Sequence, residues 1–327
     1  MTIEWAEDTE LGQGYQQTTF DLGDDPDGEG QVFATLVKAD PPTSTTGAIL
    51  YVHGFTDYFF QRELADFFTA RGYAFYALDL RKCGRSRRDG QLAHYVSDLA
   101  LYDDELDRAL DVVRSETGHS VLLSAHSTGG LILPLWLARR RTRHGGGVDP
   151  GVTGLILNSP WFDLQGAPWM RTIGTQVIRG VSALRPKEPM RLPASTNYGA
   201  SIAASEQGEW DYNLVFKPVA GFPVTFGWLN AVRRGQARFH RGLDVGVPSL
   251  VLRSTRTYFS TRFSDRSVGA DTVLDVKQIA RWSGCLGGHT TVVPIEGAKH
   301  DVFLSPQAAR DQAYATVDTW LKDRGLL

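Results

Sequence analysis

The most constraining feature of this chain is the run from Val121 to Leu133, which reads VLLSAHSTGGLIL. An apolar strand leads into Ser127, and an apolar helix begins directly after it. A serine on such a tight turn projects its hydroxyl away from the sheet. The residues two positions before and after it crowd each other under the turn, so they must be small, and here they are Ala125 and Gly129. The run is close to the G-x-S-x-G pattern of a nucleophile elbow and predicts a nucleophilic serine.

The composition is that of an ordinary globular protein. The chain has 327 residues, of which 42% are apolar and 22% charged, so one large α/β domain or two small ones can bury a core. Its net charge of −3 does not favour nucleic-acid binding. Cys83 and Cys285 are too far apart in sequence for a metal motif, and two cysteines make no disulfide framework. We therefore expect no metal, no organic cofactor and no nucleic acid.

The beginning of the chain and its hydropathy bear on the compartment. The first eight residues, MTIEWAED, are acidic and lack the basic and apolar regions of a signal peptide. No stretch approaches the ~20 apolar residues of a membrane-spanning helix. We expect a soluble, cytoplasmic protein without membrane insertion.

Short apolar segments alternate with helical patterns along most of the chain. Strands are expected at 32–38, 48–53, 74–78, 121–124, 153–158, 248–253 and 291–295, and helices at 61–70, 96–113 and 306–324. This alternation predicts an α/β fold, with a mostly parallel central sheet covered by helices on both faces. Ligands bind at the carboxyl ends of the strands in such sheets, and Ser127 lies at one of them.

Residues 163–245 break this alternation and are rich in proline and large aromatic residues. We expect an inserted helical lid, with residues 1–162 and 246–327 forming the core. Residues 163–246 contain 10 Lys and Arg and 6 Asp and Glu, whereas all other residues together contain 24 Lys and Arg and 31 Asp and Glu. A solvated basic face explains the excess most simply, and an anionic substrate or a membrane surface is the alternative. Four aromatic residues of the lid are candidates for substrate binding: Trp169, Trp210, Phe226 and Trp228.

A serine nucleophile needs a histidine base that is oriented by a carboxylate. In hydrolases with this elbow the acid follows the serine and the histidine follows the acid. His300 fits best, because a short loop after the strand at 291–295 lets it reach back to Ser127. The other histidines after the serine lie in an arginine-rich loop, in the expected lid and before a strand: His144, His240 and His289.

Three aspartates that follow the strand at 248–253 are candidates for the acid. Asp275 has the spacing of a helix N-cap, which explains it without catalysis. Asp265 lies within the polar loop 257–269, which has little to hold a side chain rigidly. Asp271 lies between that loop and the following helix, so we favour Asp271 and keep Asp265 as the alternative.

The tetrahedral intermediate of acyl transfer also needs two backbone N–H donors. Thr128 follows the nucleophile at the start of the helix and supplies one of them. The other is expected from Phe55, in the loop after the strand at 48–53, where Gly54 allows the backbone to approach.

Five segments together carry a family resemblance: His53–Phe55, Asp79–Ser86, Ala125–Gly130, Ala270–Asp275 and Glu296–His300. With them the chain resembles the monoacylglycerol-lipase-like (serine aminopeptidase S33-type) branch of the α/β-hydrolases over most of its length. The resemblance implies the α/β-hydrolase fold. The loop at 254–269 is longer than is usual in this branch, and the lid is not recognisably that of a lipase, so no substrate class is implied.

These observations predict a serine hydrolase that cleaves carboxylic esters, in the manner of an esterase, a lipase or a lysophospholipase. Ser127, His300 and Asp271 would form the triad, with the Phe55 and Thr128 amides as the oxyanion hole. The alternatives are an amide, peptide or carbon–carbon bond hydrolase or an acyltransferase with the same triad, and a non-catalytic small-molecule receptor. The expected partner is a small ester substrate, and the oligomeric state is left open.

Overall fold

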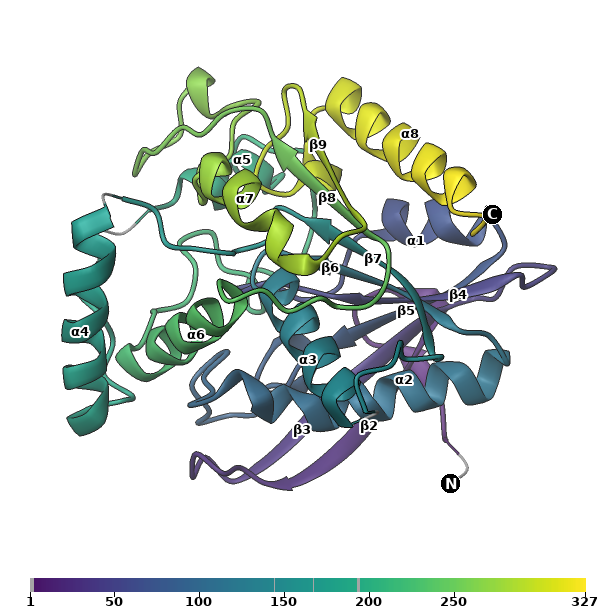
Figure 1. Ribbon diagram of the computed structural model, residues 1–327, viewed down its shortest axis with the longest axis horizontal. Helices are drawn as coiled ribbons and strands as arrows, with labels where there is room; N and C mark the ends of the chain where they lie inside the picture. The colour runs from purple at the N-terminus through teal and green to yellow at the C-terminus, as the bar shows by residue number, and fades with distance from the viewer. Residues whose placement is uncertain (1–2, 144, 167, 193–194) are drawn as a thin grey trace.

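The computed structural model describes residues 3–143, 145–166, 168–192 and 195–327, without the side chains of residues 168–170. A nine-stranded sheet runs through it in the order β1-β2-β3-β5-β4-β6-β7-β8-β9 (Figure 1). The strands are β1 (Ala6–Asp8), β2 (Gly12–Asp24), β3 (Gln31–Ala39), β4 (Gly47–Val52), β5 (Tyr73–Asp79), β6 (Val121–His126), β7 (Val152–Asn158), β8 (Ser249–Ser254) and β9 (Thr290–Ile295).

The sheet is mostly parallel, as the alternation of strands and helices predicts. Strands β5, β4, β6, β7, β8 and β9 pair in parallel, whereas β1, β2 and β3 form an antiparallel edge. Each strand expected from an apolar run is present within two residues of its expected bounds. β1 and β2 were not expected, because their sequences are largely polar and most of their side chains are half-buried or exposed.

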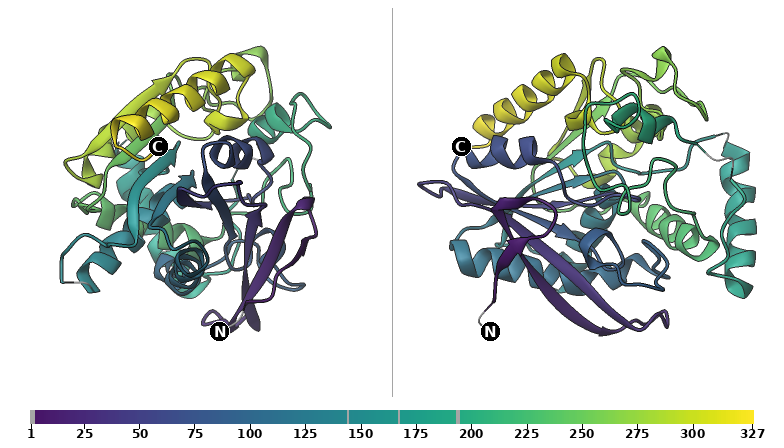
Figure 2. Two further views of the ribbon diagram at one scale, coloured as in Figure 1. Left: turned by 90° about the vertical axis from the view of Figure 1, so that its right-hand side faces the viewer. Right: turned by 180° about the vertical axis from the view of Figure 1, so that it is seen from behind.

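Helices cover both faces of the sheet (Figure 2). α1 (Arg62–Thr69) and α8 (Gln307–Asp323) lie on one face, and α2 (Asp103–Thr117) and α3 (Gly129–Arg143) on the other. Successive residues of β4 alternate between the two cores: Ile49 packs with α1 and α8, and Leu50 packs with α2 and α3. A parallel strand buried on both faces is therefore a nearly continuous apolar run, which is why the sequence indicates such strands.

Among the described residues between β7 and β8, three form helices: α4 (Pro168–Leu184), α5 (Asn197–Ile202) and α6 (Phe226–Phe239). α6 packs on α3, and α4 packs on α6, so α4 lies at the edge of the molecule (Figures 1 and 2). These helices occupy the segment in which the sequence predicts an insertion. The domain limits at residues 163 and 245 remain a prediction.

The remaining described elements are short. α7 spans Val276–Trp282, and 3₁₀ turns occur at Gly84–Ser86, Leu99–Tyr102, Asp265–Ser267, Ser283–Leu286 and Val302–Leu304. No helix in the described ranges combines the length and the apolar character that crossing a membrane requires.

Candidate active site

Ser127 lies on the turn that joins β6 to α3, at the carboxyl edge of the sheet. Its backbone has a φ of +51°, a left-handed conformation that non-glycine residues adopt rarely and that recurs at functional turns. The close packing expected under this turn is present, because a Cβ at Gly129 would lie 2.5 Å from the carbonyl oxygen of His53. That Cβ would also lie 3.3 Å from the methyl carbon of Ala125. The contact with the His53 carbonyl therefore requires glycine at position 129, and the closeness of Ala125 favours small residues at both positions.

Ser127, His300 and Asp271 are brought into hydrogen-bonding contact. The Oγ of Ser127 lies 3.0 Å from Nε2 of His300, and Nδ1 of His300 lies 3.0 Å from Oδ2 of Asp271. His300 is 2% exposed and Asp271 is fully buried. The carboxylate can orient the imidazole and the imidazole can accept the serine proton, which is the arrangement of a nucleophilic triad.

The loop after β8 holds Asp271 in a defined orientation. Its Oδ1 accepts hydrogen bonds from the backbone N–H groups of Val273 (2.8 Å) and Leu274 (2.7 Å), which leaves Oδ2 for the imidazole. Its backbone pairs with the segment directly after β8, since the Asp271 carbonyl accepts from the Tyr258 N–H at 2.9 Å. The carboxylate is therefore positioned from several directions.

The other candidates for the acid and the base lie elsewhere. Asp265 is exposed in a 3₁₀ turn, and Asp275 caps α7 by accepting from the Lys277 N–H at 3.0 Å. His240 stacks on Trp282 with 3.6 Å between ring centroids. His144 falls outside the described residues.

The loop after β4 places its backbone directly beside the nucleophile. A Cβ at Gly54 would lie 2.8 Å from the Cβ of Ser127, so only glycine fits there. His53 braces this loop: its Nε2 accepts from the Leu80 N–H at 3.1 Å, so its Nδ1 carries the proton and donates to the Gly54 carbonyl at 2.7 Å. Among the described residues, the backbone N–H groups of Phe55 and Thr128 donate to no protein acceptor. Both are therefore available to a ligand.

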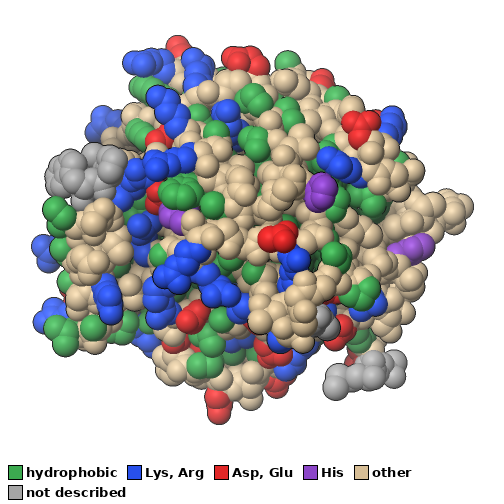
Figure 3. Space-filling model, viewed as in Figure 1, with side chains coloured by type: hydrophobic (Ala, Val, Ile, Leu, Met, Phe, Trp, Pro, Cys, Tyr) green, Lys and Arg blue, Asp and Glu red, His purple; other side chains and the backbone are tan. Residues whose placement is uncertain are grey.

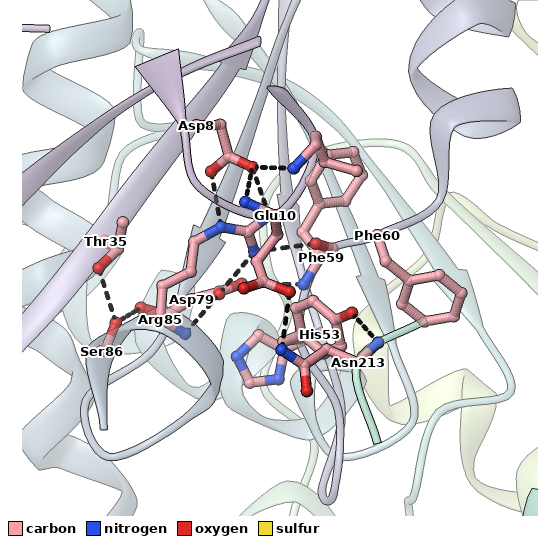
Figure 4. A network of polar contacts seen from close by, with 12 residues as sticks. Asp8, Glu10, Thr35, His53, Phe59, Phe60, Asp79, Arg85, Ser86 and Asn213 are labelled. Carbon is pink, nitrogen blue, oxygen red and sulfur yellow. Dashed lines mark hydrogen bonds and ion pairs between the residues drawn. The ribbon is translucent and has the colours of Figure 1, made fainter. Parts of the chain in front are cut away.

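A buried polar network holds the segment Asp79–Ser86 behind this loop (Figure 4). Arg85 forms buried ion pairs with Asp8 at 2.7 Å and Asp79 at 2.9 Å. Asp79 also accepts the Phe59 N–H at 2.8 Å, and Arg85 donates to the Phe59 carbonyl at 2.9 Å. Hydrogen bonds of Phe59 with Asp79 and Arg85 thus connect the segment after the candidate oxyanion loop to the end of β5.

A cavity of about 430 Å³ opens onto Ser127. Ser127, His300, Phe55 and Thr128 line it on the side of the sheet, and its remaining walls are mostly apolar. The main apolar residues of these walls are Trp161, Leu164, Ile178, Met190, Val224, Trp228, Leu229, Val273 and Leu274. Such a cavity suits an apolar substrate with one reactive polar group.

The four aromatic candidates for substrate binding are not all at this cavity. Trp228 lines it and packs against Phe55, with 4.1 Å between ring centroids. Trp210 lines a different cavity. Its Nε1 donates to the Leu304 carbonyl at 3.1 Å. Phe226 is not among the residues that line the cavity at Ser127. The side chain of Trp169 falls outside the described residues. The expectation of a shared aromatic wall fails for Trp210 and Phe226. Trp210 packs against Tyr58, Phe60 and Leu304, and Phe226 packs against the main core without lining the cavity.

A buried polar chain beside the triad was not found from the sequence. Lys217 lies 2.6 Å from Oδ1 of Asp57, and Oδ2 of Asp57 lies 3.1 Å from Nδ1 of His126. Burial favours the neutral form of Asp57, but Lys217 and His126 outweigh that effect and hold its pKa well below the ordinary value. The His126 and His300 ring centroids are 4.8 Å apart. Lys217 thereby connects the insertion to the loop beside the nucleophile, and no local motif signals a pair 160 residues apart.

Within the described residues, no group of three or more His, Cys, Asp or Glu side chains is arranged to hold a metal ion.

Comparison with known proteins decides the family. The family described as serine aminopeptidase, S33 matches residues 43–257, which is more than half of the chain. The chain belongs to this family. It is an α/β-hydrolase, and the match confirms the resemblance that the sequence motifs indicate. No curated protein sequence matches the chain.

Solved structures agree on the fold of this S33 family member. A soluble variant of monoglyceride lipase from Saccharomyces cerevisiae, in complex with a substrate analog, has a TM-score of 0.66 at 14% identity, covering 99% of this chain and 96% of that one. Monoacylglycerol lipase from Paleococcus ferrophilus has a TM-score of 0.63 at 16% identity, covering 90% and 99%. The thioesterase domain from the curacin biosynthetic pathway has a TM-score of 0.56 at 13% identity, covering 94% and 99%.

Proposed function

We propose that this protein is a serine hydrolase that cleaves carboxylic esters through an acyl-enzyme on Ser127. One observation carries the proposal: Ser127, His300 and Asp271 form a continuous hydrogen-bonded chain whose serine end opens into a largely apolar cavity. Two similar structures are those of monoacylglycerol lipases and another is that of a thioesterase domain, and all three names denote hydrolysis of an acyl bond.

The proposed reaction has two halves, acylation and deacylation, and Ser127, His300 and Asp271 act in both. Oγ of Ser127 attacks the ester carbonyl carbon while its proton moves to Nε2 of His300. Asp271 holds the Nδ1 proton and stabilises the imidazolium. The tetrahedral intermediate then expels the alcohol, which takes the proton from His300. Water, activated by the same histidine, attacks the acyl-enzyme and releases the acid.

The N–H groups of Phe55 and Thr128 are proposed to bind the oxyanion of each tetrahedral intermediate. The contact between Gly54 and Ser127 supports this role, because it brings the loop backbone next to the reacting carbon. Preorganised donors of this kind typically contribute ~3 kcal/mol each to lowering the barrier. Residues 163–245 are proposed to form a lid over the cavity, and residues 1–162 and 246–327 the catalytic core.

Cleavage of a peptide from its amino terminus, which the family name suggests, fits this cavity less well. A protonated α-amino group needs a carboxylate partner when it is removed from water. None of the described residues that line the cavity is Asp or Glu, and the one with a formal charge at neutral pH, Arg171, is cationic. Ester cleavage is therefore favoured over aminopeptidase activity.

Mixing the protein with 4-nitrophenyl acetate tests this function. We expect a stoichiometric burst of nitrophenolate followed by steady turnover, because acylation and deacylation are separate steps. A non-catalytic receptor on this fold would give neither phase. A burst without turnover, relieved by added alcohols, would indicate an acyltransferase instead.

Trp228 is predicted to set the preferred acyl chain length. Each methylene buried against the cavity wall contributes ~0.8 kcal/mol, so specificity should rise several-fold per carbon until the cavity is full. In Trp228→Ala we expect the optimum of a 4-nitrophenyl ester series to move to a different chain length. Acylation by the acetate ester should change little.

Trp210→Ala is the matched control, since this tryptophan lines another cavity. It should leave the chain-length optimum in place. An equal loss for all esters in Trp228→Ala, together with a lower melting temperature, would show that Trp228 only packs the insertion onto the core.

A further inference from the structure

The cavity at Ser127 has a second polar region on the side of the insertion. Arg171 of α4 and Gln165 line it there, whereas Ser127 and His300 line it at the edge of the sheet. α4 lies at the edge of the molecule, with α6 packed beside it (Figures 1 and 2). Apolar walls therefore connect a reactive polar region to a second one that contains a cation.

The ion pairing around Arg171 leaves one positive charge in excess. Its Nη1 donates to Oδ2 of Asp163, and Nη1 of Arg233 lies 2.8 Å from Oδ1 of the same carboxylate. Two guanidinium groups thus share one carboxylate, and all three side chains are at most 13% exposed. Trp282 also donates to Asp163 at 3.3 Å, so its carboxylate is already well satisfied.

The rest of the Arg171 guanidinium has no protein acceptor among the described residues. Among the described residues, the guanidinium of Arg171 donates one hydrogen bond, from Nη1 to Asp163. The guanidinium of Arg233, by contrast, also donates to Thr175 at 2.9 Å and to Gln236 at 2.6 Å. A poorly solvated cation in excess is costly unless an anion neutralises it. A planar guanidinium with free N–H groups matches the geometry of carboxylate and phosphate oxygens.

The wider charge distribution agrees with an anion on this side. The segment 163–246 has 10 Lys and Arg against 6 Asp and Glu. In Figure 3, Lys and Arg side chains gather over the part of the surface that carries α6. The insertion therefore adds a positive field around Arg171, the one cation among the described residues that line the cavity.

We propose that the substrate carries an anionic group, a carboxylate or a phosphate, separated from its ester by an apolar segment and bound by Arg171. This rests on the proposed ester hydrolysis and specifies its substrate class. Ser127 and Arg171 would then contact the two polar ends of one molecule, with the apolar walls between them.

Two esters that differ in one negative charge test whether the anionic group lies on the acyl side of the substrate. The 4-nitrophenyl half-ester of suberic acid carries a free carboxylate, and methyl 4-nitrophenyl suberate is its neutral counterpart with the same leaving group. The wild type should prefer the half-ester in kcat/KM. Arg171→Gln should reduce that preference roughly ten- to a hundredfold, because it removes a charged hydrogen bond. Arg171→Lys should retain part of it.

Arg179→Gln is the matched control, since Arg179 lies on the same helix, is exposed and does not line the cavity. It should leave the preference unchanged, and the rate with the neutral ester reports whether each variant is folded. If Arg179→Gln reduced the preference for the half-ester as much as Arg171→Gln, the preference would come only from the overall positive charge of the insertion and not from a contact with Arg171. A wild-type preference for the neutral ester would overturn an acyl-side carboxylate.

A second pair places the anion on the alcohol side and keeps an apolar spacer: octyl acetate and its counterpart with a terminal phosphate, 8-acetoxyoctyl phosphate. An Arg171-dependent preference for the phosphate, and none in the first pair, would assign the anion to the alcohol. Preference for the neutral member in both pairs would overturn the proposal.

Calorimetric binding to the Ser127→Ala variant separates this inference from the proposed function. We expect the suberate half-ester to bind this variant more tightly than the double variant that also carries Arg171→Gln. Arg171-dependent binding without wild-type turnover would overturn ester hydrolysis and retain the anion site. Turnover without Arg171-dependent binding of either anion would overturn the anion site and retain ester hydrolysis.

Discussion

Replacing Ser127 with alanine is expected to lower the rate of ester hydrolysis by about 10⁶-fold, because a triad acts as a unit and loses most of its rate when the nucleophile is removed. Covalent labelling by a fluorophosphonate should disappear in the same variant. The fold should persist, since the substitution removes one oxygen atom from a turn whose backbone is held by the Asn158 carbonyl at 2.9 Å. Steady-state kinetics, labelling and a melting curve check these three expectations.

Ser124→Ala is the matched control for this loss. Ser124 lies on β6, three residues before Ser127, is buried and does not line the cavity. Its variant should still be labelled and active. Labelling that persists in Ser127→Ala would mean that another residue is the nucleophile.

Replacing Asp271 with asparagine is expected to lower kcat by about 10⁴-fold. Oδ1 of Asp271 accepts two backbone N–H groups, so the carbonyl oxygen of an asparagine would remain there. Its NH₂ group would then face Nδ1 of His300 and donate to it. The imidazole would carry its proton on Nε2 and could not accept the proton of Ser127. Kinetic measurements with 4-nitrophenyl esters check this loss.

Two neighbouring aspartates provide controls for Asp271. Asp265→Asn should remain close to wild type, because Asp265 is exposed and belongs to a separate turn. Asp275→Ala should retain activity and lower the free energy of unfolding by ~1 kcal/mol, because it removes the N-cap of α7. An inactive Asp265→Asn protein would place the acid in that turn instead.

The parallel core was predictable from the sequence because its strands are buried on both faces. β6 and β7 each contain a run of apolar residues, Val121–Leu123 and Leu155–Leu157, which stands out without any tertiary information. β2 could not be recognised in this way. Its residues are largely polar and half-exposed, and its strand conformation depends on antiparallel pairing with β3.

Ser127 and the two small residues beside it were also accessible from the sequence, since a strand, a tight turn and a helix are all local features. The sequence favoured Asp271 over Asp265 and left Asp265 as the alternative, because the path of the chain between β8 and α7 depends on tertiary contacts. The bridge between Thr257 and Asp271 decides which carboxylate reaches His300.

The surroundings of the site depend on tertiary structure alone. Trp228 and Trp210 have the same chemistry and lie in the same insertion, yet packing brings only Trp228 to the cavity at Ser127. The Lys217–Asp57 pair and the pair of arginines on Asp163 likewise join residues far apart in the chain. The sequence by itself determined the alternation of elements and the position of the serine, because these follow from local patterns of burial and turn sterics. Only the tertiary structure decided which distant charges and rings meet around it, because those contacts depend on how the insertion packs on the sheet.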